Sequence, residues 1–186
     1  QGQRWFDVTV TGQEAHAGPT PMKVRRDALV GAARMVELVN RIGLDNQPGA
    51  CATVGQFEVT PNSRNTIPGR VDFTIDLRHP DADTLAAMKA ALESEAAAIA
   101  QEIGLELDLS EIWYQPPIVF DPDCVAAVAN GAAEAGYPAM EIVSGAGHDA
   151  CNVSTVAPTA MIFVPCEGGI SHNEIEEATA EDCAAG

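Results

Sequence analysis

The chain of 186 residues has no lysine or arginine after Lys89, and this absence makes its charge uneven. Residues 1–89 hold ten acidic and ten basic side chains, whereas residues 90–186 hold seventeen acidic side chains and no basic one, so the formal net charge is −17. Such a surface repels nucleic-acid phosphates and anionic lipids. We therefore expect no nucleic-acid partner and no membrane partner. The excess acid is interpreted as a solvated surface, with a basic partner or a cation site as alternatives.

Long apolar runs, paired cysteines and a signal peptide are also missing. No window approaches the roughly 18 consecutive apolar residues of a membrane span, and QGQRWFDVTV lacks the basic-then-apolar order of a signal peptide. The cysteines are dispersed without a CxxC pair, at positions 51, 124, 151, 166 and 183. This pattern argues against a disulfide framework and a cysteine zinc site. We expect a cytoplasmic protein whose cysteines are reduced and buried as small hydrophobic side chains.

Residues 1–115 carry alternating strand and helix patterns. Residues 3–12 and 71–78 alternate apolar and polar side chains, as half-buried strands do. A helix is predicted from Met22 to about Ile42, with Thr20 before Pro21 as its N-cap. A second helix is predicted over 83–103, closed by Gly104. Two further strands are predicted at 51–59, interrupted near Gly55, and at 105–112.

The predicted order of elements is βαββαβ, which is typical of a ferredoxin-like domain over residues 1–115. Pro116 and Pro117 indicate a boundary. Residues 116–186 then change to α/β order, with a helix at 123–136, strands at 140–143 and 161–164, and a final helix near Ala178. The predicted fold class is thus α/β (α+β), and the second segment is expected to be the end of a larger α/β domain.

Two histidines follow glycine-rich turns in the second segment. His172 in GGISHNE is the strongest metal candidate, but zinc needs at least three protein ligands, so a polar loop histidine remains the alternative. His148 in GAGHDA stands beside Asp149. No GxSxG nucleophile is present, which disfavours a serine-hydrolase triad.

Further candidates lie in the first segment. His16 in EAHAGPTPM could donate to a developing oxyanion or simply pack in its loop. Asn62, Asn65 and Arg78 come from a loop and the strand after it. A guanidinium is a natural partner for a substrate carboxylate, although a surface salt bridge explains Arg78 equally well.

Four separated motifs carry a family resemblance: GQEAHAGPTPMKVRRDAL, PNSRNTIPGRVDFTIDLR, SGAGHDA and MIFVPCEGGISHNE. In this order they resemble the N-carbamoyl-L-amino-acid hydrolases, with β-ureidopropionase and allantoate amidohydrolase, within the M20-type binuclear-zinc amidases. The resemblance implies a ferredoxin-like lid and dimerisation domain (1–115), followed by the C-terminal part of a zinc-peptidase-like catalytic domain (116–186).

The resemblance also implies roles for individual residues. His172 corresponds to the last metal ligand, and His16 to the lid histidine that stabilises the oxyanion in the partner subunit's site. Asn65 and Arg78 correspond to lid residues that bind the substrate carboxylate, and Gly147 and His148 to a substrate-binding turn. On this basis His16, Asn65 and Arg78 are all expected to serve the neighbouring subunit of a homodimer.

The family's other metal ligands and its general-base glutamate are expected upstream of these residues, which makes the chain a C-terminal fragment that is inactive alone. The cofactor implied is a pair of divalent metals, zinc or else manganese, cobalt or nickel. Zinc-bound hydroxide would attack the ureido carbonyl and yield an amino acid, carbon dioxide and ammonia. The alternatives are an M20-type dipeptidase or aminoacylase, and a non-catalytic module for dimerisation or ligand binding.

Overall fold

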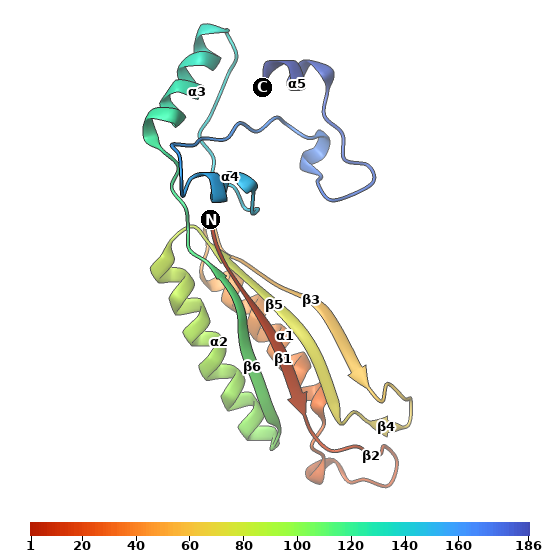
Figure 1. Ribbon diagram of the computed structural model, residues 1–186. Coiled ribbons are helices and arrows are strands. Elements are labelled where there is room, and N and C mark those ends of the chain that lie inside the picture. The colour runs from red at the N-terminus through yellow and green to blue at the C-terminus, as the bar shows by residue number, and fades with distance from the viewer. The chain divides into compact units, whose positions relative to one another are not determined.

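The structure is a computed structural model that describes residues 1–186, and the chain divides into two compact units (Figure 1). The first unit is Gln1–Pro117 and the second is Ile118–Gly186. Every buried hydrophobic residue of the chain lies at or before Leu105, so the packed core belongs to the first unit. None of the helices has the length and hydropathy that crossing a membrane requires.

The first unit is built on an antiparallel sheet of four strands. Their order across the sheet is β3-β5-β1-β6, and β1 pairs with both β5 and β6. A short second ribbon joins β2 and β4. The strands are β1 (Gly2–Thr11), β2 (Ala15–His16), β3 (Cys51–Thr60), β4 (Thr66–Ile67), β5 (Arg70–His79) and β6 (Glu106–Gln115).

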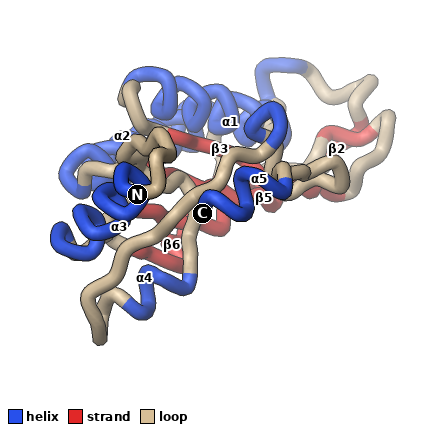
Figure 2. The backbone as a smooth tube through the Cα atoms, turned by 90° about the horizontal axis from the view of Figure 1, so that it is seen from above, coloured by secondary structure: helices blue, strands red, loops and turns tan.

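Two helices, α1 (Ala28–Asp45) and α2 (Ala82–Ile103), lie side by side on one face of this sheet (Figures 1 and 2). The alternation predicted for β5 is confirmed, because Val71, Phe73, Ile75 and Leu77 are buried beneath the helices. The predicted end of α2 is also confirmed, since Gly104 adopts the left-handed conformation with φ 74°. The interruption of β3 occurs as a register shift between Val54 and Phe57.

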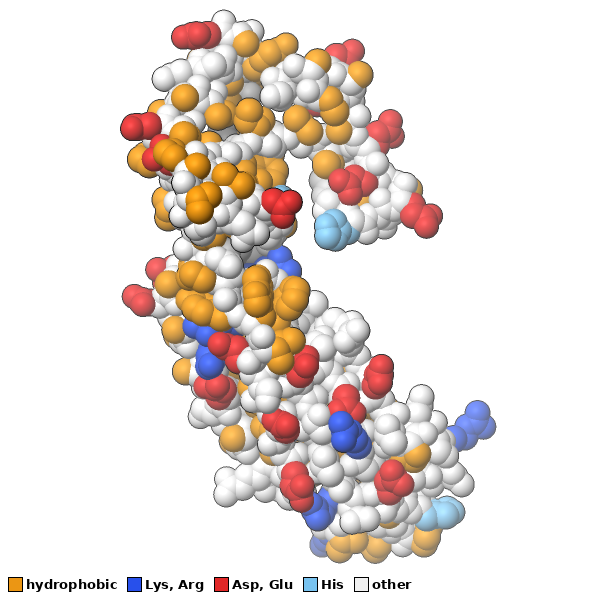
Figure 3. Space-filling model, in the orientation of Figure 1, with side chains coloured by type: hydrophobic (Ala, Val, Ile, Leu, Met, Phe, Trp, Pro, Cys, Tyr) orange, Lys and Arg blue, Asp and Glu red, His pale blue; other side chains and the backbone are white.

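The opposite face of the sheet is mostly polar, apart from the exposed neighbouring rings of Trp5 on β1 and Trp113 on β6. Acidic and basic side chains are interspersed over the face that Figure 3 presents for the first unit. On β5 this face carries two ion pairs between residues two apart, Arg70 with Asp72 and Arg78 with Asp76. Residues two apart on a strand point to the same face, which is why these pairs can form.

The predicted start of the first helix is wrong. Met22–Val24 forms only a short 3-10 turn, η1, and α1 begins at Ala28. The N-cap is Asp27, whose Oδ1 accepts hydrogen bonds from the backbone amides of Leu29 and Val30 at 3.0 and 3.2 Å. Asp27 caps the helix because its carboxylate accepts from two backbone amides of the first turn, whereas the sequence pattern of Thr20 before a proline does not start the α-helix.

The second unit contains helices but no strand. Its elements are α3 (Pro122–Glu134), α4 (Asp149–Val153), the 3-10 turn η2 (Glu167–Gly169) and α5 (Ala180–Ala185). The strands predicted at 140–143 and 161–164 are absent, and Met140, Ile142 and Ile162 are exposed. A strand is stabilised by a hydrogen-bonded neighbour, and neither segment has one within residues 1–186.

All five cysteines are free thiols, but the prediction that they are buried is wrong. Cys51 is exposed at the start of edge strand β3. The other four lie in the second unit, which buries no residue, so they remain partly or fully exposed.

Candidate functional site

His16 and Asn65 lie together in the β2–β4 ribbon. His16 is opposite Thr66 in the ladder, and the backbone amide of Ala17 donates to the backbone carbonyl of Asn65 over 2.8 Å. Both site candidates are exposed. Two motifs about fifty residues apart in the sequence thus present an imidazole and an amide from one ribbon.

The His16 ring is oriented by its own loop. Its Nδ1 accepts a hydrogen bond from the backbone amide of Gly18 over 3.0 Å. In a neutral imidazole one nitrogen accepts and the other carries the proton, so this contact places the proton on Nε2. The ring can therefore donate a hydrogen bond from Nε2 to a ligand oxygen.

Arg25 holds the loop that follows His16. Its Nη2 donates to the carbonyl of Ala17 over 2.6 Å, and its Nε and Nη2 donate to the carbonyl of Thr20 over 3.1 and 2.9 Å. These bonds link both ends of the segment between β2 and η1. Arg25 was not a sequence candidate, because a contact with two loop carbonyls leaves no pattern in the sequence.

Asn65 is held by a short local contact. The hydroxyl of Ser63 donates to its Oδ1 over 3.1 Å, which leaves the Asn65 NH2 group as donor. Asn62, the other asparagine of this loop, has a positive φ of 54°. Asparagine tolerates this left-handed conformation better than most residues, so turn geometry accounts for Asn62.

Arg78 lies on β5 of the four-stranded sheet, at the end of that strand away from the β2–β4 ribbon. It is eight residues along β5 from Arg70, and at about 3.3 Å per residue the two are about 26 Å apart. Arg70 is the end nearest the ribbon, since Gly12 donates to the carbonyl of Gly69 and β4 immediately precedes β5. The structure therefore does not bring Arg78 together with His16 and Asn65 within one chain.

Asp76, two residues earlier on β5, forms an ion pair with the Arg78 guanidinium. Arg78 Nη2 donates to Asp76 Oδ2 over 2.6 Å, and Arg78 Nε lies 3.1 Å from both carboxylate oxygens. The same Oδ2 accepts a bond from Gln3 Nε2 over 2.9 Å. Sequence reasoning missed Asp76, although its place two residues before Arg78 on a strand was the available signal.

His148 and Gly147 form the turn before α4. His148 is the N-cap position of this short helix, and its Nε2 is 3.0 Å from Ser144 Oγ. The ring packs edge-on against Phe163, with centroids 5.4 Å apart. A Cβ added at Gly147 would meet nothing within 4 Å, so the turn is open there.

His172 stands in an exposed loop after η2. It is one of two non-glycine residues with a positive φ, here 55°. Its backbone amide donates to Glu176 Oε2 over 2.8 Å. A non-glycine residue in this region stores backbone strain and often marks a functional position.

The residues present do not make a metal site by themselves. No three His, Cys, Asp or Glu side chains gather in a way that could hold a metal ion. His172 could supply one nitrogen ligand, which is fewer than either a structural or a catalytic zinc needs.

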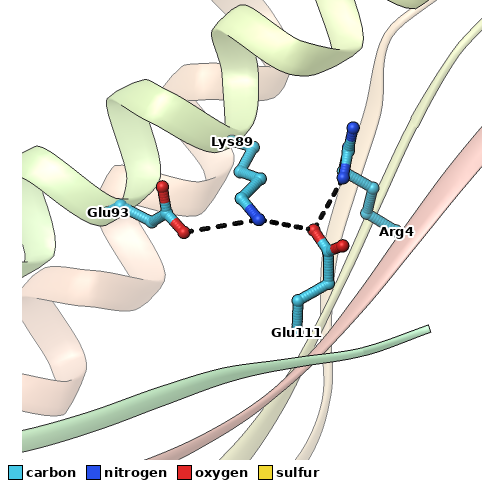
Figure 4. Close-up of polar contacts among 4 residues, drawn as sticks. All are labelled: Arg4, Lys89, Glu93 and Glu111. Atoms are coloured by element: carbon cyan, nitrogen blue, oxygen red, sulfur yellow. Dashed lines mark hydrogen bonds and ion pairs between the residues drawn. The ribbon is translucent and has the colours of Figure 1, made fainter. Parts of the chain in front are cut away.

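Glu111 on β6 forms ion pairs with two basic side chains, shown in Figure 4. Its Oε2 accepts from Arg4 Nη1 over 2.7 Å and from Lys89 Nζ over 2.9 Å, and Lys89 also pairs with Glu93. Burial alone would raise the pKa of Glu111, but the hydrogen bonds from Lys89 and Arg4 outweigh it and lower the pKa. This network braces α2 against β1 and β6 and is structural.

Comparison with known proteins assigns the chain to a family. The model of peptidase family M20/M25/M40 matches residues 9–186. The chain belongs to this M20 family. Members of the family generally use divalent metals, and the family resemblance read from the motifs is confirmed.

Three M20 relatives illustrate the match. The N-carbamoyl-L-amino-acid amidohydrolase of Rhizobium meliloti is 47% identical over the whole chain, which covers 45% of that protein. The allantoate amidohydrolase of Escherichia coli K12 is 36% identical over the whole chain, again covering 45%. A crystal structure of a hydantoinase/carbamoylase family amidase from Burkholderia vietnamiensis is 63% identical with a TM-score of 0.96; the match covers 100% of this chain and 45% of that one. The chain thus spans about half the length of these M20 proteins.

Proposed function

We propose that residues 1–186 are part of a longer amidohydrolase that cleaves the ureido amide bond of N-carbamoyl-L-amino acids or related ureido acids. The observation that carries this proposal is the 47% identity, across the whole chain, with an N-carbamoyl-L-amino-acid amidohydrolase. The products would be an amino acid, carbon dioxide and ammonia. With under half of the relatives' length, these residues alone would be inactive.

The first unit would act as a ferredoxin-like lid and dimerisation domain. Two helices on one face of an antiparallel sheet, in the order β3-β5-β1-β6, support this description. His16 would stabilise the oxyanion that forms when the ureido carbonyl is attacked, because its Nε2 is the proton-bearing nitrogen. Asn65, from the same ribbon, would donate from its amide to the substrate.

Arg78 would bind the substrate carboxylate through its guanidinium fork. The roughly 26 Å of β5 between the ribbon end and Arg78 far exceeds the length of an N-carbamoyl amino acid. One chain therefore cannot apply all three residues to one substrate molecule. In a homodimer, Arg78 of one copy would act with His16 and Asn65 of the other, which changes the expectation that all three serve the neighbouring subunit.

The second unit would contribute one wall of the catalytic domain. The open turn at Gly147 and the ring of His148 would contact the substrate. His172 would be one ligand of the divalent-metal centre, with its remaining ligands outside residues 1–186.

The test is ammonia release by the full-length protein that carries this chain. N-carbamoyl-L-amino acids should be hydrolysed, and the same compounds with the carboxylate replaced by a carboxamide should be poor substrates, because Arg78 requires a carboxylate. Hydrolysis of dipeptides or acyl amino acids with no action on ureido acids would overturn the proposal.

A further inference from the structure

The carboxylate of Asp76 engages Arg78 along one edge of its guanidinium. Nε and Nη2, which form that edge, both donate to Asp76, over 3.1 and 2.6 Å. A guanidinium is planar, so two bonds along one edge fix the plane of the whole group. Asp76 is in turn fixed by Gln3, the β1 residue directly opposite Arg78 in the ladder, through the bond to Oδ2.

The same strand repeats this arrangement at its other end. Arg70 donates through Nε and Nη2 to the two oxygens of Asp72, both over 2.7 Å. Thr9 of β1 donates to Asp72 Oδ1 over 2.7 Å. This bond corresponds to the bond that Gln3 of β1 donates to Asp76. The Arg70 hydrogen bond holds the pKa of Asp72 below its ordinary value. The fold thus contains two Arg–Asp pairs on one strand, each supported by a donor on β1.

The two arrangements differ in how far solvent reaches them. The side chains of Arg78 and Asp76 are 27% and 23% exposed, against 55% and 37% for Arg70 and Asp72. Gln3 is only 6% exposed and is one of two buried polar residues in the chain. A buried amide needs a partner, and here the partner is Asp76. The Arg78–Asp76 pair is therefore less exposed to solvent than the Arg70–Asp72 pair, and it is supported by a buried side chain.

We propose that Asp76, supported by Gln3, is a positioning residue that fixes the Arg78 guanidinium for bidentate binding of the substrate carboxylate. This inference rests on the proposed function. Bidentate recognition depends on the plane of the fork, so an Arg78 that rotates freely would bind a carboxylate less well. The negative charge of Asp76 also partly offsets the positive charge of Arg78, which by itself would weaken the binding of a substrate carboxylate. The two hydrogen bonds along one edge of the guanidinium and the buried Gln3 favour alignment as the larger effect.

The test compares Asp76→Asn with Asp72→Asn in the full-length protein. Asp76→Asn should raise KM for an N-carbamoyl-L-amino acid by about ten-fold, the effect of one charged hydrogen bond, with kcat within about two-fold. Asp72→Asn should change both constants by less than about two-fold, since the hydrogen-bond partners of the Asp72 side chain are Arg70 and Thr9 and none of the proposed site residues. The preference for the carboxylate substrate over its carboxamide should fall in Asp76→Asn alone.

A KM that is unchanged or lower in Asp76→Asn would overturn the inference, and so would an equal rise in both variants. A wild-type protein without ureido hydrolysis would instead refute the proposed function. If Asp76→Asn fails to fold, Gln3→Met decides, because it removes only the donor to Asp76. It should raise KM by about three-fold, and an unchanged KM would contradict the proposal.

Discussion

The backbone amide of Ala17 donates to the backbone carbonyl of Asn65 over 2.8 Å, and this bond joins the two loops that carry His16 and Asn65. The loops are continuous with β1 and β5, which pair along their whole length. The positions of His16 and Asn65 are therefore set by the register of the sheet, and any change that loosens the loops should affect both residues together.

Replacement of Arg25 by alanine should loosen the His16 loop. The variant loses hydrogen bonds to the carbonyls of Ala17 and Thr20, and we expect a loss of about 1–3 kcal/mol in the free energy of unfolding. In the full-length protein kcat should fall more than KM rises. Lys23→Ala, an exposed change in the same segment, is the control and should leave both properties unchanged. Equal behaviour of the two variants would show that Arg25 does not hold the loop.

Replacing Asp27, the observed N-cap of α1, should lower the free energy of unfolding more than replacing Thr20, the predicted N-cap. Asp27→Ala should lower the free energy of unfolding by about 1 kcal/mol, because the amides of Leu29 and Val30 lose their acceptor. Thr20→Ala should cost less than about 0.5 kcal/mol, because Arg25 binds the carbonyl of Thr20 and not its side chain. Denaturant unfolding of the 1–186 chain can be followed by tryptophan fluorescence, as both tryptophans lie in the first unit.

The Glu111 network should make stability depend on acid pH. The folded-state pKa of Glu111 lies below its ordinary value of 4.5, so its contribution is present above that pH and is lost as the pH falls through the lowered pKa. Glu111→Gln should thus destabilise the chain at pH 7 by about 1 kcal/mol, with the difference from wild type shrinking below pH ~4.5. Glu106→Gln, a change at the exposed start of β6, is the control and should change the free energy of unfolding at pH 7 by less than about 0.5 kcal/mol. A constant difference down to pH ~3 would contradict this assignment.

The sequence predicted the elements whose stability is local or whose pattern repeats. The alternation of β5 and the glycine that ends α2 follow from backbone geometry and burial, and both are as predicted. The strands at 140–143 and 161–164 are wrong, because a strand pattern cannot specify whether a neighbouring strand exists. The predicted start of α1 is too early, because both Thr20 and Asp27 are suitable N-cap residues and only Asp27 accepts hydrogen bonds from the first turn of the helix.

The site shows a similar limit. The motifs indicated His16, Asn65 and Arg78 as candidates, but their separation depends on where β4, β5 and the ribbon meet. Side-chain supports such as Asp76 and Arg25 depend on contacts across strands and loops. Residue type and spacing alone do not carry that information.

The most direct test of the account is complementation between two inactive variants of the full-length protein. His16→Ala and Arg78→Ala should each abolish most hydrolysis of an N-carbamoyl-L-amino acid. If Arg78 of one copy acts with His16 of the other, a mixed dimer contains one intact site. Dissociating, mixing and reassociating the variants should then restore about a quarter of wild-type activity, as random pairing predicts. No recovery in dimers shown to be mixed would contradict the account.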